Sequence, residues 1–221
     1  MGDMVTFKSN GHTCDGYLAG SGPGVLVIQE WWGLVPHIKD VVDRLAEAGF
    51  TALAPDLYHG GSSTEPDGAG KLMMALNLEQ AAKDLSGAIA LLQERSGAPK
   101  VGVVGYCMGG GLALVVASQR PDAVAAVAPY YGVIPWATAQ PDWAAITAKV
   151  VGEYAEIDDF AGPAASQALQ AQLRELGKDA TLHIHPGTQH AFFNDARPEV
   201  YDAAAATQAW ARTLELFRTT L

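Results

Sequence analysis

The chain has 221 residues, 49% of them hydrophobic, and a formal net charge of −10. This length and composition are those of a globular protein that can bury a core of its own, so we expect one domain over residues 1–221. The acidic balance argues against nucleic acids and anionic membrane surfaces as partners, because both would repel the chain.

Cysteine content and hydropathy predict a cytoplasmic protein. Cys14 and Cys107 are too few for a disulfide scaffold in a chain of this length. No secretory signal is visible, nor any run of the ~20 apolar residues that a membrane span needs. We expect a monomer or a small homo-oligomer that uses no cofactor and no metal.

Strand and helix patterns alternate along the chain. Asn10-Gly11 is a typical hairpin turn between the first two strands, and Gly, Ser and Pro predict a loop over 60–70. The strand patterns cover 5–8, 13–18, 24–29, 51–54, 101–104, 123–128, 149–154 and 180–184. The helical patterns cover 36–48, 77–95, 112–117, 162–177 and 198–221.

This alternation indicates βαβ units, which build a mostly parallel sheet with helices on both faces and the opening hairpin at one edge. That is the layout of an α/β-hydrolase fold, and its active site would lie at the carboxyl ends of the strands. About twenty residues separate the strand ending at Ala128 from the one starting at Lys149, too few for a large cap domain. We therefore expect an open pocket and a small substrate.

A cysteine stands where a hydrolase of this layout would carry its nucleophile. Gly105-Tyr-Cys107-Met-Gly109 lies between an apolar strand and a buried helix, and it matches the Gly-x-nucleophile-x-Gly turn with a thiol in place of a hydroxyl. Such a turn requires small residues two positions on either side, which Gly105 and Gly109 supply. The N-terminus of the helix would favour the thiolate of Cys107. The alternative is a glycine-rich turn with an inert buried cysteine.

A thiol nucleophile needs a base, and the base an orienting acid, in the chain order nucleophile, acid, histidine. Three histidines come too early in this order: His12, His37 and His59. His183 and His185 lie within a strand, whereas His190 follows the last strand at the carboxyl edge of the sheet. We expect His190 to be the base.

The acid should follow the strand at 149–154, where four carboxylates compete: Glu153, Glu156, Asp158 and Asp159. Spacing alone gives Asp158 a modest lead, because it has the reach of a short loop. Asp159 could instead cap the next helix.

Other residues complete the predicted site. Glu30 ends the third strand and could hold the thiol proton at rest or be a surface charge. The backbone N–H groups of Met108 and Trp31 are the expected oxyanion donors. The aromatic residues expected to line the pocket, several of which could be core, are Tyr58, Tyr130, Tyr131, Trp136, Phe192 and Phe193.

Together these pieces resemble the dienelactone hydrolase family over nearly the whole chain. The motifs that carry the resemblance are Glu30, Gly105-Tyr-Cys107-Met-Gly-Gly110, Asp158 and His190-Ala-Phe192, with Pro55-Asp-Leu-Tyr58 and Tyr130-Tyr-Gly132. The family's Gly-Glu-x-Asp-x-Phe pattern is similar to Ala155-Glu-Ile-Asp158-Asp-Phe160, with Ala for Gly. The resemblance therefore selects Asp158 as the acid.

The resemblance implies that Cys107 attacks a lactone or ester carbonyl, with His190 as acid and base and Asp158 orienting it. It also implies that Glu30 pairs with the resting thiol until substrate displaces that pairing. The family's dienelactone-cleaving members carry two arginines that bind the substrate carboxylate, and Gly60 and Asn194 stand at those positions here. Arg197 could compensate, and the natural substrate stays open.

Several other functions compete with this one. A broad esterase for small activated esters is the nearest alternative, and a non-catalytic thiol or ligand-binding scaffold is a more distant one. A metal site from His183, His185 and His190 lacks a further ligand at suitable spacing. A dehydrogenase is disfavoured, because the glycine-rich turn lacks the Gly-x-Gly-x-x-Gly spacing.

Overall fold

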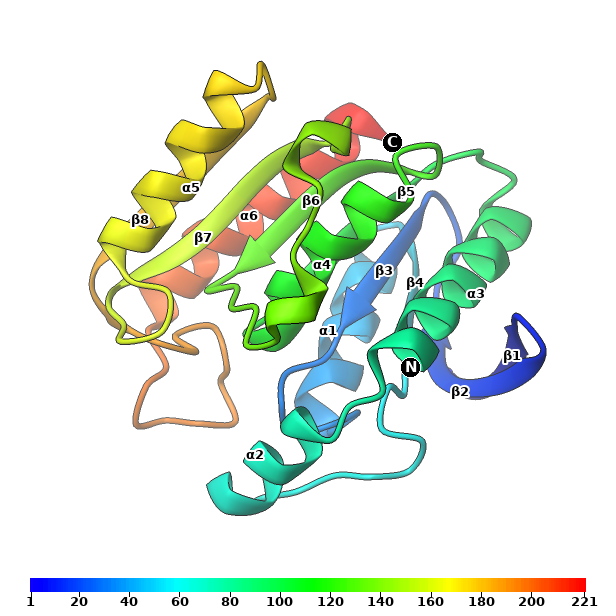
Figure 1. The fold of residues 1–221 in the computed structure, drawn as a ribbon. Helices are drawn as coiled ribbons and strands as arrows, with labels where there is room; N and C mark the ends of the chain where they lie inside the picture. Colours follow the sequence, from blue (N-terminus) through cyan, green and yellow to red (C-terminus); the bar gives the residue numbers. More distant parts are fainter.

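The structure is a computed structural model that describes residues 1–221, and it is built on one eight-stranded sheet with helices on both faces (Figure 1). The strand order is β1-β2-β4-β3-β5-β6-β7-β8. The strands are β1 (Asp3–Ser9), β2 (His12–Ala19), β3 (Gly24–Ile28), β4 (Thr51–Pro55), β5 (Val101–Tyr106), β6 (Val124–Tyr130), β7 (Lys149–Ile157) and β8 (Ala180–Gln189). The helices are α1 (Pro36–Glu47), α2 (Pro66–Met74), α3 (Leu78–Ser96), α4 (Met108–Gln119), α5 (Pro163–Glu175) and α6 (Ala203–Thr220).

The predicted fold is confirmed in its main features. β4, β3, β5, β6, β7 and β8 run parallel, whereas β1 and β2 are antiparallel and form the edge. Asn10 and Gly11 both have positive φ, as the turn of a two-residue hairpin requires. β3, β4 and β5 are buried along their whole length, because helices cover both faces of the parallel strands.

Two hydrophobic layers hold the helices to the sheet. α1 and α6 cover one face, and α3, α4 and α5 cover the other (Figure 1). The connection between β6 and β7 holds only two short 3-10 turns, Ala137–Ala139 and Trp143–Ala145, so no large cap is present. The carboxyl edge of the sheet is thus accessible.

Some element boundaries differ from the prediction. The expected loop over 60–70 contains the start of α2, whose first turn begins with Pro66, a residue suited to that position. β7 and β8 are longer than predicted and end at Ile157 and Gln189. The last helix begins at Ala203, where the Asp202 side chain caps it by accepting a hydrogen bond from the Ala205 N–H at 2.9 Å.

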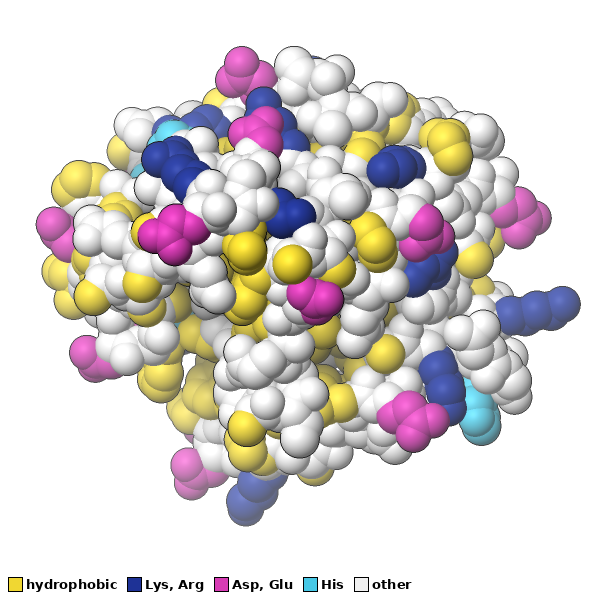
Figure 2. All heavy atoms as spheres, turned by 45° about the horizontal axis from the view of Figure 1, so that its top comes forward, with side chains coloured by type: hydrophobic (Ala, Val, Ile, Leu, Met, Phe, Trp, Pro, Cys, Tyr) yellow, Lys and Arg dark blue, Asp and Glu magenta, His cyan; other side chains and the backbone are white.

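Surface charge is mixed despite the acidic total. Figure 2 shows acidic and basic side chains interspersed among hydrophobic and neutral ones on the face that it draws. No helix is both long enough and apolar enough to cross a membrane.

Candidate active site

Cys107 lies at a strained turn between β5 and α4. Its φ of 54° and ψ of −120° are uncommon for a residue with a side chain. A Cβ on Gly105 would lie 2.0 Å from the Gly109 carbonyl oxygen, and one on Gly109 would lie 2.4 Å from two backbone oxygens of β3 and Gln29. Both glycines are therefore required, as the motif predicts, and the turn holds the half-exposed Cys107 side chain at the N-terminus of α4.

The other cysteine is in a different environment. Cys14 is 1% exposed and does not line the cavity that contains Cys107. Burial, followed by the nearby carboxylates of Asp84 and Asp56, raises the pKa of the Cys14 thiol to about 12. Cys14 therefore lacks the partly exposed, electropositive surroundings of a reactive cysteine.

His190 and Asp158 meet at the carboxyl ends of the last two strands, β7 and β8, which are neighbours in the sheet. The His190 Nδ1 atom lies 2.7 Å from Asp158 Oδ2, and the carboxylate of Asp158 is fully buried. Its other oxygen accepts hydrogen bonds from the N–H groups of Phe160 and Ala161, at 2.8 and 3.0 Å. Asp158 therefore occupies a fixed position against the imidazole ring.

The competing carboxylates have other surroundings. Glu156 accepts a hydrogen bond from the Gly187 N–H at 2.8 Å, and Glu153 is buried against His185. Asp159 is exposed and does not cap α5, whose N-cap residue is Gly162. Of the four candidates, Asp158 is the one that contacts His190.

Burial and charge shift the pKa values of His190 and Asp158 in opposite directions. Burial by itself lowers the pKa of His190, but the interactions with Asp158 and Cys107 outweigh it and raise the pKa to about 10. Burial likewise raises the pKa of Asp158, yet the hydrogen bond and charge of His190 bring it below its usual value. The pair is an imidazolium and a carboxylate at neutral pH.

Glu30 is a buried carboxylate that lines a cavity together with Cys107 and His190. It is 1% exposed, its Oε2 accepts from the Asn194 side-chain amide at 2.8 Å, and its Oε1 accepts from the Tyr131 hydroxyl at 3.4 Å. These partners differ from the expected pairing with the thiol. Tyr131 also packs against His190, with ring centroids 4.9 Å apart, and so links the two groups.

Two backbone N–H groups lie where oxyanion donors were predicted. Met108 is the first residue of α4, so its N–H has no partner within the helix. The Trp31 N–H, just beyond β3, donates to no acceptor in the protein. β3 and β5 are neighbours in the sheet, which brings both residues to the same edge as Cys107.

Comparisons with known proteins agree with this geometry. Residues 15–221 match the model of the dienelactone hydrolase family. The chain belongs to this family. A protein of Aquifex pyrophilus named "Protein usf" is 37% identical over 99% of this chain and 98% of its own. A protein of Aquifex aeolicus (strain VF5), provisionally named a carboxymethylenebutenolidase, is 36% identical over the full length of both chains.

A solved structure is also similar to this chain. It is a Klebsiella pneumoniae protein provisionally named a dienelactone hydrolase, with a TM-score of 0.88, 25% identity and coverage of 99% of this chain and 98% of its own. The fold of the dienelactone hydrolase family therefore extends over the whole chain.

Gly60 and Asn194, which the sequence analysis compared with substrate-binding arginines, do not line the cavity that contains Cys107 and His190. Gly60 is exposed at φ +96°, a conformation that would strain an arginine. Asn194 is 2% exposed and turned to Glu30. Asn194 is thus a partner of Glu30, a role that sequence reasoning missed because it compared this position with a substrate-binding arginine.

A cavity of about 960 Å³ opens above Cys107 and is lined mainly by apolar side chains. Its walls come from the segment after β6, from α5 and from the residues beyond β3 and β8. Residues that line it include Trp31, Cys107, Val133, Ile134, Trp143, Asp158, Phe160, Leu169, His190 and Arg197.

None of the six aromatic residues predicted as pocket walls lines this cavity, and Tyr131 and Phe193 are almost fully buried. Tyr58 packs against Met108, with its hydroxyl 3.3 Å from the Met108 sulfur. Trp136 is 7% exposed and donates to the Met73 carbonyl, and Phe192 is fully buried. Tyr130 is buried with its hydroxyl 2.8 Å from that of Thr213. These side chains form the core behind the cavity.

The charged lining of the cavity is mostly acidic. Glu30, Asp158 and Asp159 contribute carboxylates, and Arg197 is the one guanidinium. Arg197 donates to Glu199 at 2.8 Å and lies over the Trp32 ring. His185 and His190 interact with different carboxylates, Glu153 and Asp158, and the disfavoured metal site from His183, His185 and His190 is not among the groups of side chains close enough to share an ion.

Proposed function

We propose that this protein hydrolyses carboxylic esters or lactones through an acyl-thioester on Cys107, with His190 as acid and base and Asp158 as its orienting partner. The observation that carries the proposal is that Cys107, His190 and Asp158 line one cavity, with His190 Nδ1 2.7 Å from Asp158 Oδ2. The protonated His190 balances a thiolate, and the N-terminus of α4 favours the same charge.

The chemistry follows from these positions. The Cys107 thiolate attacks the carbonyl carbon, and the negative charge that develops on the carbonyl oxygen is stabilised by the N–H groups of Met108 and Trp31. His190 gives its proton to the leaving oxygen as the C–O bond breaks. Water then attacks the thioester, His190 takes one of its protons, and the carboxylic acid and the Cys107 thiolate are released.

Hydrogen bonds from Asn194 and Tyr131 fix the position of the Glu30 carboxylate, which bears on its role in this scheme. Two donors hold the Glu30 carboxylate in one orientation on the cavity wall. Together with Asp158 and Asp159 it makes the cavity lining acidic, which opposes the binding of acidic substrates. We assign Glu30 this electrostatic role, with transfer of the thiol proton to it as the family-based alternative.

We further infer that the substrate is neutral and largely apolar. A cavity of about 960 Å³ accommodates a ligand larger than a five-membered lactone. The one guanidinium on its wall, that of Arg197, already pairs with Glu199, and three carboxylates share the lining. A substrate carboxylate would have no unpaired cation to bind, which favours a broad esterase over an enzyme for carboxylated dienelactones.

The test compares p-nitrophenyl butyrate with mono-p-nitrophenyl succinate, which has a similar length and a terminal carboxylate. The butyrate should give a kcat/KM at least about tenfold higher, because one buried unpaired charge is worth more than 1.4 kcal/mol. Faster cleavage of the succinate, or of a carboxylated dienelactone, would disprove the inferred neutral substrate but not the hydrolase.

The nucleophile is tested by trapping. Brief reaction with p-nitrophenyl butyrate should add one butyryl group to the Cys107 peptide in mass spectra, and Cys107→Ala should lose both this adduct and turnover. His190→Gln should lose turnover, whereas His183→Gln, on the preceding strand β8, should keep it. Turnover that survives Cys107→Ala in a folded protein would reject the proposed function.

A further inference from the structure

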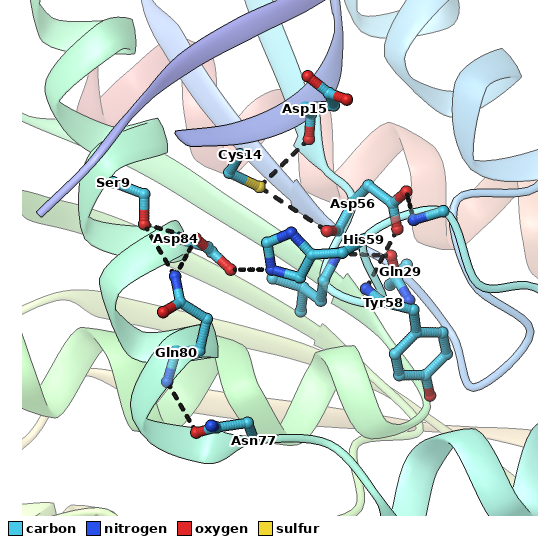
Figure 3. A network of polar contacts seen from close by, with 12 residues as sticks. Ser9, Cys14, Asp15, Gln29, Asp56, Tyr58, His59, Asn77, Gln80 and Asp84 are labelled. Atoms are coloured by element: carbon cyan, nitrogen blue, oxygen red, sulfur yellow. Dashed lines mark hydrogen bonds and ion pairs between the residues drawn. The ribbon is translucent and has the colours of Figure 1, made fainter. Parts of the chain in front are cut away.

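A second group of reactive side chains lies outside the cavity. Cys14 on β2, His59 just beyond β4 and Asp84 on α3 meet beside the edge hairpin (Figure 3). One ligand atom from each of the three lies within 4.8 Å of the others. None of the three lines the cavity above Cys107, so the proposed reaction leaves this cluster unexplained.

Anionic groups dominate the surroundings of the cluster. Asp84 is 0% exposed, and its partners are His59 Nε2 at 2.9 Å, the Gln80 amide at 2.9 Å and the Ser9 hydroxyl. Neither Lys nor Arg contacts Asp84. His59 is thus the one group in contact with this buried carboxylate that can carry positive charge.

Oxygen atoms and carboxylates also surround the Cys14 thiol. Cys14 donates toward the backbone carbonyl oxygens of Asp15 and Asp56, at 3.2 and 3.7 Å (Figure 3). The side-chain charges of Asp15, Asp56 and Asp84 all act on it. Buried anionic groups normally have a counter-charge, and a bound cation would supply it here.

The ligand types and their spacing fit one class of cation. Zn²⁺ takes thiolate, imidazole and carboxylate ligands at about 2.0–2.3 Å, which places tetrahedral ligands roughly 3.3–3.8 Å apart. Ligand atoms already within 4.8 Å of one another need to approach by about an ångström. The His59 side chain is 44% exposed, so it can move, and it gives access from solvent.

Two polar side chains next to the cluster, Ser9 and Gln80, have the position of outer-shell partners of a metal ligand. Ser9 and Gln80 donate to the Asp84 oxygen that does not face His59, and so orient the carboxylate. A thiol and an imidazole exclude Mg²⁺ and Ca²⁺ as preferred ions, because these cations prefer oxygen ligands.

We propose that Cys14, His59 and Asp84 bind a divalent cation of the Zn²⁺ class, with water in the fourth position. Binding releases the thiol proton to solvent. The metal would join β2, the segment after β4 and α3. Tyr58, the neighbour of His59, contacts Met108, so the metal would also brace the segment that packs behind the proposed oxyanion donor.

The test is a titration with Co²⁺ alone, because a cobalt–thiolate bond gives an intense near-ultraviolet absorption. The full-length protein carries Cys107→Ala after chelator treatment, so that Cys14 is the one thiol left. We expect a saturable band at one Co²⁺ per chain, displaced by Zn²⁺ but not by Mg²⁺, and a higher Tm with Zn²⁺.

The matched variant is His59→Asn, because His59 has a φ of 50° and Asn tolerates this conformation. It should weaken Co²⁺ binding by at least about 10–100-fold, the loss typical of removing even an outer-shell partner. His12→Asn changes an exposed histidine on β2, the strand that carries Cys14, and should leave binding unchanged. A band that needs Cys107, no band at all, or an unchanged affinity in folded His59→Asn would each overturn the proposal.

Discussion

Arg212 on α6 makes the ion pair that joins this helix to β7. Its guanidinium donates to both oxygens of Glu153, at 2.8 and 2.7 Å, and the Glu153 side chain is fully buried. Arg212→Met would leave a buried carboxylate without this counter-charge, at a cost of about 3–5 kcal/mol. A chain of this size loses about 2–4 °C of Tm per kcal/mol, so the midpoint should fall by roughly 6–20 °C.

The assay is reversible urea unfolding together with thermal unfolding, followed by circular dichroism. Arg218→Met is the control, because Arg218 lies on the same helix, is exposed and has no ion-pair partner; its effect should stay within about 0.5 kcal/mol. Adding Glu153→Gln to Arg212→Met should recover part of the loss, since the buried charge is then gone. Equal effects of Arg212→Met and Arg218→Met would refute the reasoning.

Three more predictions concern the candidate site. Asp158→Asn should lower kcat/KM by about 10²–10⁴-fold, because His190 loses its orienting partner, whereas exposed Asp159→Asn should change it less than twofold. Asn194→Leu should destabilise the fold by about 1.5–3 kcal/mol in urea unfolding, because Glu30 loses a charge-assisted hydrogen bond, and Glu30→Gln in the same chain should reduce that loss. Because the pKa of His190 is about 10 in the folded protein and about 6.5 unfolded, the folded state holds an extra proton between these values. The contribution of His190 to the free energy of unfolding should therefore be complete below about pH 6.5. It should fall as pH rises toward 10, by up to about 1.4 kcal/mol per pH unit, and His190→Gln should flatten this decline.

Local sequence was sufficient to predict the parts of the site that depend on backbone geometry. The turn at Cys107 needs a residue without Cβ at Gly105 and Gly109, so the motif and the structure express the same steric requirement. The positions of His190 and Asp158 follow from parallel strands, whose carboxyl ends meet at one edge of the sheet. Spacing did not separate Asp158 from its neighbours, and the resemblance to the family was needed.

Contacts between distant segments were not predicted. Glu153 and Arg212 are 59 residues apart, and Asn194 is 164 residues from Glu30; no pattern in the chain pairs them. The aromatic residues failed as pocket predictions for a related reason. Tyr130 and Phe192 are adjacent in sequence to site residues, but whether such a side chain faces the cavity or the core depends on strand register and turn geometry.

The protonation of His190 explains why a thiol suits this turn. A serine hydroxyl does not ionise near neutral pH and would need a neutral imidazole as its base. A thiol ionises far more readily, and the resulting thiolate needs a neighbouring cation and a proton donor for the leaving group. His190 supplies both because Asp158 and Cys107 hold its pKa at about 10.

A thiol nucleophile also limits the substrate, because a thiolate is itself a good leaving group. It attacks productively when the expelled oxygen is a stabilised anion, such as a phenolate or an enolate. Under the proposed mechanism, we therefore expect faster cleavage of activated esters and enol lactones than of simple alkyl esters.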